Sequence, residues 1–164
     1  MKLLFSLILI ACSFSSYASG PLERVDFYSE SFLGLPYVAG PLGEGPNGKV
    51  DQDPLIRFDA FDCTTYVETV LALSYAAEDA DEEDLTSTLN QIRYSNGLPS
   101  FITRNHFTSV DWNPHIEELL LAKDVTRKLF KKEFAVRSAN IDKQAWFKKY
   151  HNVDVSISKQ TAKL

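Results

Sequence analysis

Cys63 is the residue of this sequence that could most directly carry out covalent chemistry. The chain has 2 cysteines, and the other one, Cys12, lies in an apolar leader whose removal would leave Cys63 without a disulfide partner in the chain. A single thiol in an exported protein suggests a function. A thiolate nucleophile works with a histidine, and His106 lies in a second chemically rich stretch. We therefore predict a thiol hydrolase; the alternative is that Cys63 is a small buried hydrophobic residue.

A helix that begins near Cys63 is predicted to position the thiol. Apolar side chains within residues 66–71 recur at the spacing of one helical face, and Asp59 or Asp62 can accept hydrogen bonds from the free amides of the first turn. Several β-branched residues leave a strand as the alternative, but the length favours a helix that runs to about residue 77. Backbone dipoles at a helix start favour the thiolate, whereas the neighbouring Asp62 opposes a second negative charge.

The stretch from residue 101 to residue 112 is predicted to be extended. Its polar and apolar residues alternate, so an extended segment would present Arg104, His106 and Trp112 on one side. His106 could then serve as the base for Cys63. The alternative is that His106 is a hydrogen-bonded structural histidine and that Arg104 belongs to an ion pair.

Hydrophobic periodicity and turn residues predict the other elements. We expect helices at residues 22–32, 85–94, 116–130 and 141–150, and strands at residues 133–137 and 153–158. Glycines and prolines crowd residues 33–53, which predicts a long irregular loop around an extended piece at 35–39; such a loop could be functional or a surface connection. The acidic run at 78–84 is interpreted as a solvated turn and helix start, because it lacks the glycine and ligand alternation of a calcium loop. No metal or other cofactor is expected.

The N-terminal residues predict export. Lys2 precedes the apolar run Leu3–Ala11, which is too short to span a bilayer, and Ser16-Tyr17-Ala18 supplies the small residues that precede a cleavage site. We therefore expect residues 1–18 to be a signal peptide and the mature chain to be periplasmic, beginning at Ser19. The alternative is lipidation of Cys12, which would anchor the protein to a membrane as a lipoprotein.

The composition predicts one globular domain after the leader, residues 19–164. Of the 164 residues, 45% are hydrophobic and 24% are charged, which provides a sizeable core and does not resemble a disordered chain. The formal net charge is −5. Nucleic acids and anionic membranes favour clustered Lys and Arg, so neither is expected as a partner.

Several motifs, in order along the chain, resemble those of NlpC-type, papain-like cell-wall hydrolases. The piece Gly34-Leu35-Pro36-Tyr37 is similar to a motif that supplies a tyrosine beside the nucleophile, and Asp62-Cys63 is similar to the pair that opens the cysteine helix. Residues 92–94, 103–107, 111–112 and 123–126 resemble, more narrowly, the N-acetylmuramoyl-L-alanine amidase-like branch. The resemblance covers about residues 31–126.

This resemblance implies an α+β, papain-like fold and a cysteine amidase. Its substrate would be peptidoglycan or muropeptide fragments, and it would cleave the amide between the lactyl group of muramic acid and L-alanine. Cys63 would be the nucleophile. The matching positions imply a substrate-binding set that comprises Tyr37, Asp62, Thr64, Arg104, Asn105, Asp111 and Trp112.

The resemblance is confined to the N-terminal, cysteine-bearing half of that fold. Relatives place the catalytic histidine on a later pair of strands that has no counterpart here. The fold is therefore expected to be incomplete, a helical half with few short strands, C-terminally truncated and lacking most of the β-barrel. Either His106 serves as the base, or the chain is a non-catalytic relative that binds cell-wall peptide or a protein partner through Tyr37, Arg104 and Trp112.

Overall fold

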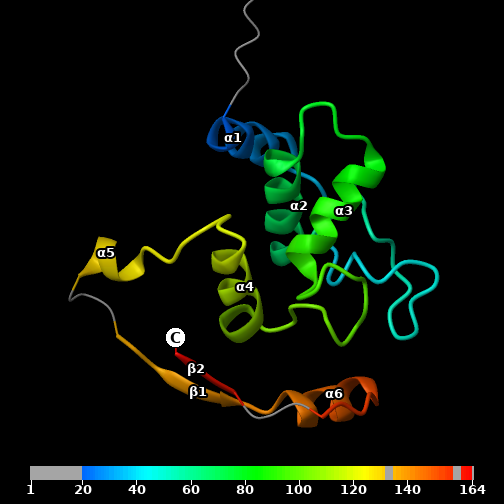
Figure 1. Cartoon of the computed structure of the whole chain (residues 1–164), viewed down its shortest axis with the longest axis vertical. Coiled ribbons are helices and arrows are strands. Elements are labelled where there is room, and N and C mark those ends of the chain that lie inside the picture. The colour runs from blue at the N-terminus through cyan, green and yellow to red at the C-terminus, as the bar shows by residue number, and fades with distance from the viewer. Residues whose placement is uncertain (1–19, 132–134, 157–159, 164) are drawn as a thin grey trace, which may run out of the picture.

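The computed structural model describes residues 20–131, 135–156 and 160–163, and this part of the chain is mostly helical. The long helices come first: α1 (Pro21–Ser31), α2 (Cys63–Tyr75) and α3 (Glu82–Arg93). They are followed by the π-helix η1 (Thr108–Trp112), α4 (Asn113–Glu118), α5 (Thr126–Phe130), β1 (Ser138–Ile141), α6 (Lys143–His151) and β2 (Gln160–Lys163). Helix α2 packs against both α1 and α3, whereas α5 lies apart from this helical body (Figure 1).

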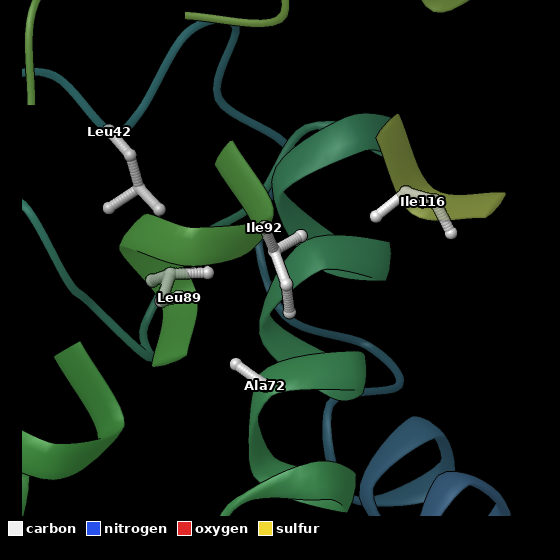
Figure 2. Close-up of a cluster of buried hydrophobic side chains, with 5 residues drawn as sticks. All are labelled: Leu42, Ala72, Leu89, Ile92 and Ile116. Carbon is white, nitrogen blue, oxygen red and sulfur yellow. The ribbon is translucent and has the colours of Figure 1, made fainter. Parts of the chain in front are cut away.

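A hydrophobic core joins α2, α3 and α4 beneath the loop that precedes α2. Its buried members are Leu42 from that loop, Ala72 from α2, Leu89 and Ile92 from α3, and Ile116 from α4 (Figure 2). Burial of apolar side chains is the main favourable contribution to folding. It fixes α2, and with it Cys63, against α3.

Helix α1 confirms the helix predicted at residues 22–32, and it braces α2 at both ends. Near the start of α2, the Tyr66 hydroxyl donates to the carbonyl of Ser29 at 2.7 Å. At the other end, Arg24 Nη1 donates to the carbonyl of Ala76, the C-cap residue, at 3.0 Å. A cation at a helix C-terminus also complements the backbone dipoles. The helix predicted to end near residue 77 is confirmed, with Tyr75 as its last residue.

The extended segment predicted at residues 101–112 is wrong. Residues 101–103 form a turn, and residues 108–112 form η1, in which the amide of Trp112 donates to the carbonyl of Phe107 at 3.2 Å. The Asp111 carboxylate accepts a hydrogen bond from the amide of Phe107 at 3.2 Å and closes the turn. Side-chain alternation does not reveal such local capping. Arg104, His106 and Trp112 therefore do not share one face of a strand.

The helix predicted at residues 116–130 is wrong as one continuous element. Helix α4 ends at Glu118, and Leu120 adopts the left-handed conformation with a φ of 59°. The amide of Leu120 donates to Glu117 at 3.1 Å and that of Leu121 to Ile116 at 3.2 Å, which is the pattern of a Schellman helix end. These bonds satisfy carbonyls that a broken helix would otherwise expose, so the shorter α5 forms separately.

The C-terminal helix is confirmed, and the strands beside it are displaced. Helix α6 replaces the helix predicted at 141–150, and its N-cap, Asp142, accepts from the amide of Ala145 at 2.9 Å. The strands expected at 133–137 and 153–158 do not form where the structure describes those residues. Instead β1 and β2 pair antiparallel, with Ser138 opposite Lys163 and Ile141 opposite Gln160. Residues 133, 134, 157 and 158 lie outside the described part.

The predicted leader also lies outside the described residues. The signal peptide at 1–18, its cleavage site and the alternative lipidation at Cys12 therefore stay predictions. Within the described ranges, no helix is both long and apolar enough to cross a membrane.

Candidate active site

Cys63 is the first residue of α2, and its side chain is exposed. Asp62 caps the helix: its Oδ1 accepts from the amide of Thr65 at 2.8 Å, and the Thr65 hydroxyl accepts from the amide of Asp62 at 3.0 Å. This reciprocal pair is a capping box, so Asp62 rather than Asp59 caps the start of the helix. The positive end of the helix dipole consequently faces Cys63 and favours an anion there.

Among the described residues, the hydrogen-bond contact of the Cys63 sulfur is with the Thr64 hydroxyl at 3.9 Å. Both side chains are exposed. Within those ranges no histidine forms a hydrogen bond to the thiol. The structure therefore presents the predicted nucleophile to solvent without the base that would take its proton.

His106 lies in an aromatic cluster instead of beside Cys63. Its Nε2 lies 2.6 Å from the carbonyl oxygen of Phe101, and its ring packs against Trp146 and Phe147 of α6, with ring centroids 5.1 and 5.3 Å away. Burial lowers the pKa of His106 to about 4, although the Phe101 carbonyl partly opposes this. The imidazole is therefore neutral at physiological pH and donates its Nε2 proton to Phe101.

The segment that carries Tyr37 lies next to the start of α2. Its segment forms a parallel bridge with Phe61: the amide of Val38 donates to the carbonyl of Phe61 at 3.0 Å, and the amide of Phe61 donates to Pro36 at 3.1 Å. The Tyr37 side chain is 71% exposed. Two chain segments that are distant in the sequence therefore place an exposed phenol and an exposed thiol on neighbouring stretches of backbone.

Arg104 and Asn105 point into the protein rather than toward Cys63. The Arg104 Nη2 pairs with Glu44 and, at 2.8 Å, with Asp51 Oδ2. The Asn105 amide donates to the carbonyl of Ile92 at 3.2 Å and is buried. These two side chains hold the loop before α2 and the end of α3, so their predicted contact with substrate is not supported by this arrangement.

Asp111 and Trp112 also serve the interior of the protein. Asp111 pairs with Lys143 and so ties η1 to α6. The Trp112 indole Nε1 donates to Glu68 Oε1 at 3.0 Å. Neither contact leaves the polar group of the side chain free for a ligand.

Sequence reasoning missed the buried ion pair between Glu68 and Arg93. Glu68 lies on α2 and Arg93 on α3, with Oε2 and Nε 3.2 Å apart, and they are 4% and 2% exposed. Burial raises the pKa of Glu68 to about 7, and Arg93 and Trp112 partly oppose this rise. Glu68 is the only acidic residue in the α2 sequence, and a lone carboxylate in an apolar helix was the available signal.

The described residues contain no group of three or more His, Cys, Asp or Glu side chains placed to hold a metal ion. The candidate site comprises Cys63, Tyr37 and the Asp62 cap. These groups could support nucleophilic attack by sulfur. The amide of Cys63 lies at the helix start, where an oxyanion could be stabilised.

Comparison with known proteins identifies one matching family model and several similar solved structures. A family model described as AmiA-like, N-acetylmuramoyl-L-alanine amidase-like, matches residues 27–162. A crystal structure of a Legionella pneumophila protein superposes with a TM-score of 0.76 at 32% identity, covering 89% of this chain and 56% of its own. An N-acetylmuramoyl-L-alanine amidase from Bacteroides uniformis gives a TM-score of 0.63 at 23% identity, covering 80% and 53%. No curated protein sequence matches the chain.

The chain spans about half the length of these solved relatives. The structural likeness shows that this chain shares the fold of part of those proteins. The predicted α+β class is met only in part, since the described residues are mostly helical and carry one short two-stranded ribbon.

Proposed function

The chain belongs to the N-acetylmuramoyl-L-alanine amidase-like family, and from that premise we propose that it is a cysteine amidase acting on peptidoglycan or muropeptides. The observation that carries the proposal is an exposed thiol at the first position of a capped helix of 13 residues. Tyr37, on the adjoining stretch of backbone, would line the site. The bond cleaved would be the amide between the muramic acid lactyl group and L-alanine.

The reaction would proceed by acyl transfer. The Cys63 thiolate attacks the amide carbonyl carbon, and the oxyanion that forms is stabilised at the start of α2. Collapse of this intermediate breaks the C–N bond, and the peptide amine leaves after it gains a proton. Water then attacks the thioester, which releases the lactyl carboxylate and returns the thiol.

The proton transfers require a base within reach of Cys63. The prediction that His106 supplies it is not favoured by this arrangement, because His106 would have to leave the Phe101 carbonyl and the aromatic cluster. The other two histidines are also engaged elsewhere: His115 Nε2 lies 2.7 Å from the carbonyl oxygen of Gln91, and the His151 ring packs against Phe101 and Trp146. The proposed catalytic step therefore rests on Cys63 as a necessary group.

A second candidate function is non-catalytic binding of cell-wall peptide or of a protein partner. The absence of a histidine beside Cys63 among the described residues favours it. The exposed Tyr37 would contribute to such binding, whereas Arg104 and Trp112 are already engaged in the interior.

Incubation of the purified protein with muropeptides distinguishes the two functions. The amidase predicts release of free peptide and a new lactyl carboxylate by mass spectrometry, and both should disappear in Cys63→Ala. Ser87→Ala is the control, because Ser87 is an exposed residue of α3 outside the candidate site. Binding of muropeptide by both wild type and Cys63→Ala, without release, would support the second function. If the protein neither binds nor cleaves muropeptide, both proposed functions are contradicted.

We also propose that the mature protein is one periplasmic domain that begins at Ser19. The basis is the leader sequence alone. The mass of the N-terminal peptide after expression in a Gram-negative host tests this directly. A diacylated N-terminal Cys12 would instead identify a lipoprotein.

A further inference from the structure

The glycine-rich loop, residues 40–53, is held in place by charged side chains from three other parts of the fold. The carboxylates of Glu44 and Asp51 pair with Arg104. Two further attachments are made to the main chain of the loop, by Asp62 and by Arg93. The loop is therefore an ordered structure and not a floppy surface connection.

Two short backbone runs pair with each other, residues 43–45 within the loop and residues 51–54 at its end. The amides of Gly43, Glu44 and Gly45 donate to the carbonyls of Pro54, Asp51 and Asp53 at 3.0, 3.0 and 2.9 Å. A Cβ added at Gly43 would collide with the Asp51 carboxylate and with the backbone. Only glycine permits this close approach at residue 43.

Arg93 is the main attachment of the loop to the helical body. Its Nη2 donates to the carbonyl of Leu42 at 3.0 Å, and its Nη1 donates to the carbonyl of Gly43 at 3.3 Å. The neighbouring Tyr94 hydroxyl donates to the same Gly43 carbonyl at 2.9 Å. A planar guanidinium can bind two adjacent carbonyls at once, which a lysine ammonium does not reproduce.

Glu68 supplies the counter-charge that keeps Arg93 in the interior. A buried arginine without a partner is strongly unfavourable, and Glu68 Oε2 lies 3.2 Å from Arg93 Nε. The other groups that influence the pKa of Glu68 are the Trp112 indole, which donates a hydrogen bond to it, and the charges of Asp62 and Arg104. Because Glu68 belongs to α2, this pair connects the loop to the helix that carries Cys63.

The start of the loop is also attached to the residue that precedes the thiol. Asp62 Oδ2 accepts a hydrogen bond from the amide of Gly40 at 3.1 Å, while Asp62 Oδ1 caps α2 through Thr65. One side chain thus fixes both the start of the loop and the start of the cysteine helix. The position of the loop relative to Cys63 is set at two places, Asp62 and Arg93.

We propose that Arg93, held by Glu68, is a positioning residue that fixes the glycine-rich loop as a rigid wall of the substrate site beside Cys63. Only the reference to a substrate rests on the proposed amidase function; the rigid attachment of the loop can be measured without turnover. Arg93 does not touch the reacting atoms and acts through the loop.

Limited proteolysis tests the attachment, because Lys49 is an exposed trypsin site within the loop. Arg93→Lys keeps the charge and loses the double contact with Leu42 and Gly43, so cleavage after Lys49 should become at least about tenfold faster. Arg57→Lys is the matched control: Arg57 forms a pair with the exposed Asp59 at 2.8 Å, and its cleavage pattern should equal that of wild type. Equal rates for Arg93→Lys and wild type would overturn the proposal.

Other measurements test the attachment of the loop independently of the stability of Arg93→Lys. In the wild type, hydrogen exchange should protect the amides of Gly43, Glu44 and Gly45, and exchange at unstructured rates would overturn the proposal. Glu68→Gln, which keeps the side-chain shape, should also accelerate cleavage after Lys49, and no acceleration would count against the role of Glu68 in holding Arg93.

If muropeptide is hydrolysed, Arg93→Lys should raise KM more than it lowers kcat. Absence of turnover would remove the amidase function and leave the loop measurements standing.

Discussion

Glu68 and Trp112 are 44 positions apart in the chain and meet in the interior, where the indole Nε1 donates to Glu68 Oε1 at 3.0 Å. The second carboxylate oxygen of Glu68 faces Arg93 at 3.2 Å. One buried carboxylate thus links the helix that carries Cys63 to η1 and to α3. Buried polar groups are costly when a partner is removed, so this contact predicts measurable losses.

Trp112→Phe should lower the free energy of unfolding by about 1–3 kcal/mol. The substitution keeps an aromatic ring but leaves the buried Glu68 oxygen without its donor. Urea unfolding followed by circular dichroism measures the loss. Trp146→Phe is the matched control, because the Trp146 ring packs against the rings of His106 and Phe107 in the aromatic cluster. An equal loss in both variants would mean that ring packing, not the hydrogen bond, is responsible.

Glu68→Gln should change how stability depends on pH. Burial raises the pKa of Glu68 from 4.5 to about 7, so the folded state binds this proton more tightly than the unfolded state. The wild type should therefore lose stability relative to Glu68→Gln as pH rises from about 4.5 to about 7, by up to about 3 kcal/mol. Urea unfolding of both proteins at several pH values gives the difference. A difference that is constant across this range would show that Glu68 does not titrate there.

His106→Phe should have the opposite pH signature. Burial lowers the pKa of His106 from 6.5 to about 4, so the unfolded state binds this proton more tightly. The wild type should lose stability relative to His106→Phe as pH falls from about 6.5 to about 4, by up to about 3 kcal/mol. The rate at which iodoacetamide labels Cys63 should not change, because no contact joins the two side chains. A large drop in labelling would instead place His106 at the thiol.

Asp62→Ala should cost more stability than the removal of an ordinary helix cap. Loss of an N-cap costs about 1–2 kcal/mol, and Asp62 also binds the amide of Gly40. Asp81→Ala is the matched control, since Asp81 caps α3 through the amide of Asp84 at 2.9 Å. Only Asp62→Ala should accelerate tryptic cleavage after Lys49. Equal cleavage in both variants would show that Asp62 does not restrain the loop.

The local features of the site were predictable from the sequence. The capped helix at Cys63 follows from Asp62 and from apolar residues at helical spacing, and these signals act within a few residues of one another. The predictions failed where backbone hydrogen bonds competed with side-chain pattern. Asp111 turned a predicted strand into η1, and the left-handed Leu120 divided a predicted helix.

The sequence by itself determined the capped helix that begins at Cys63, the tyrosine motif and the family resemblance, because motif order and helix capping are encoded locally. Only the tertiary structure determined which groups His106, Arg104 and Trp112 contact. Each of these side chains meets its partner across a long stretch of chain or within a packed cluster: His106 among the aromatic rings of α6, Arg104 at Glu44 and Asp51, and Trp112 at Glu68. Burial makes an unpaired polar group costly, so these partners are determined by long-range packing, which a local sequence pattern does not predict.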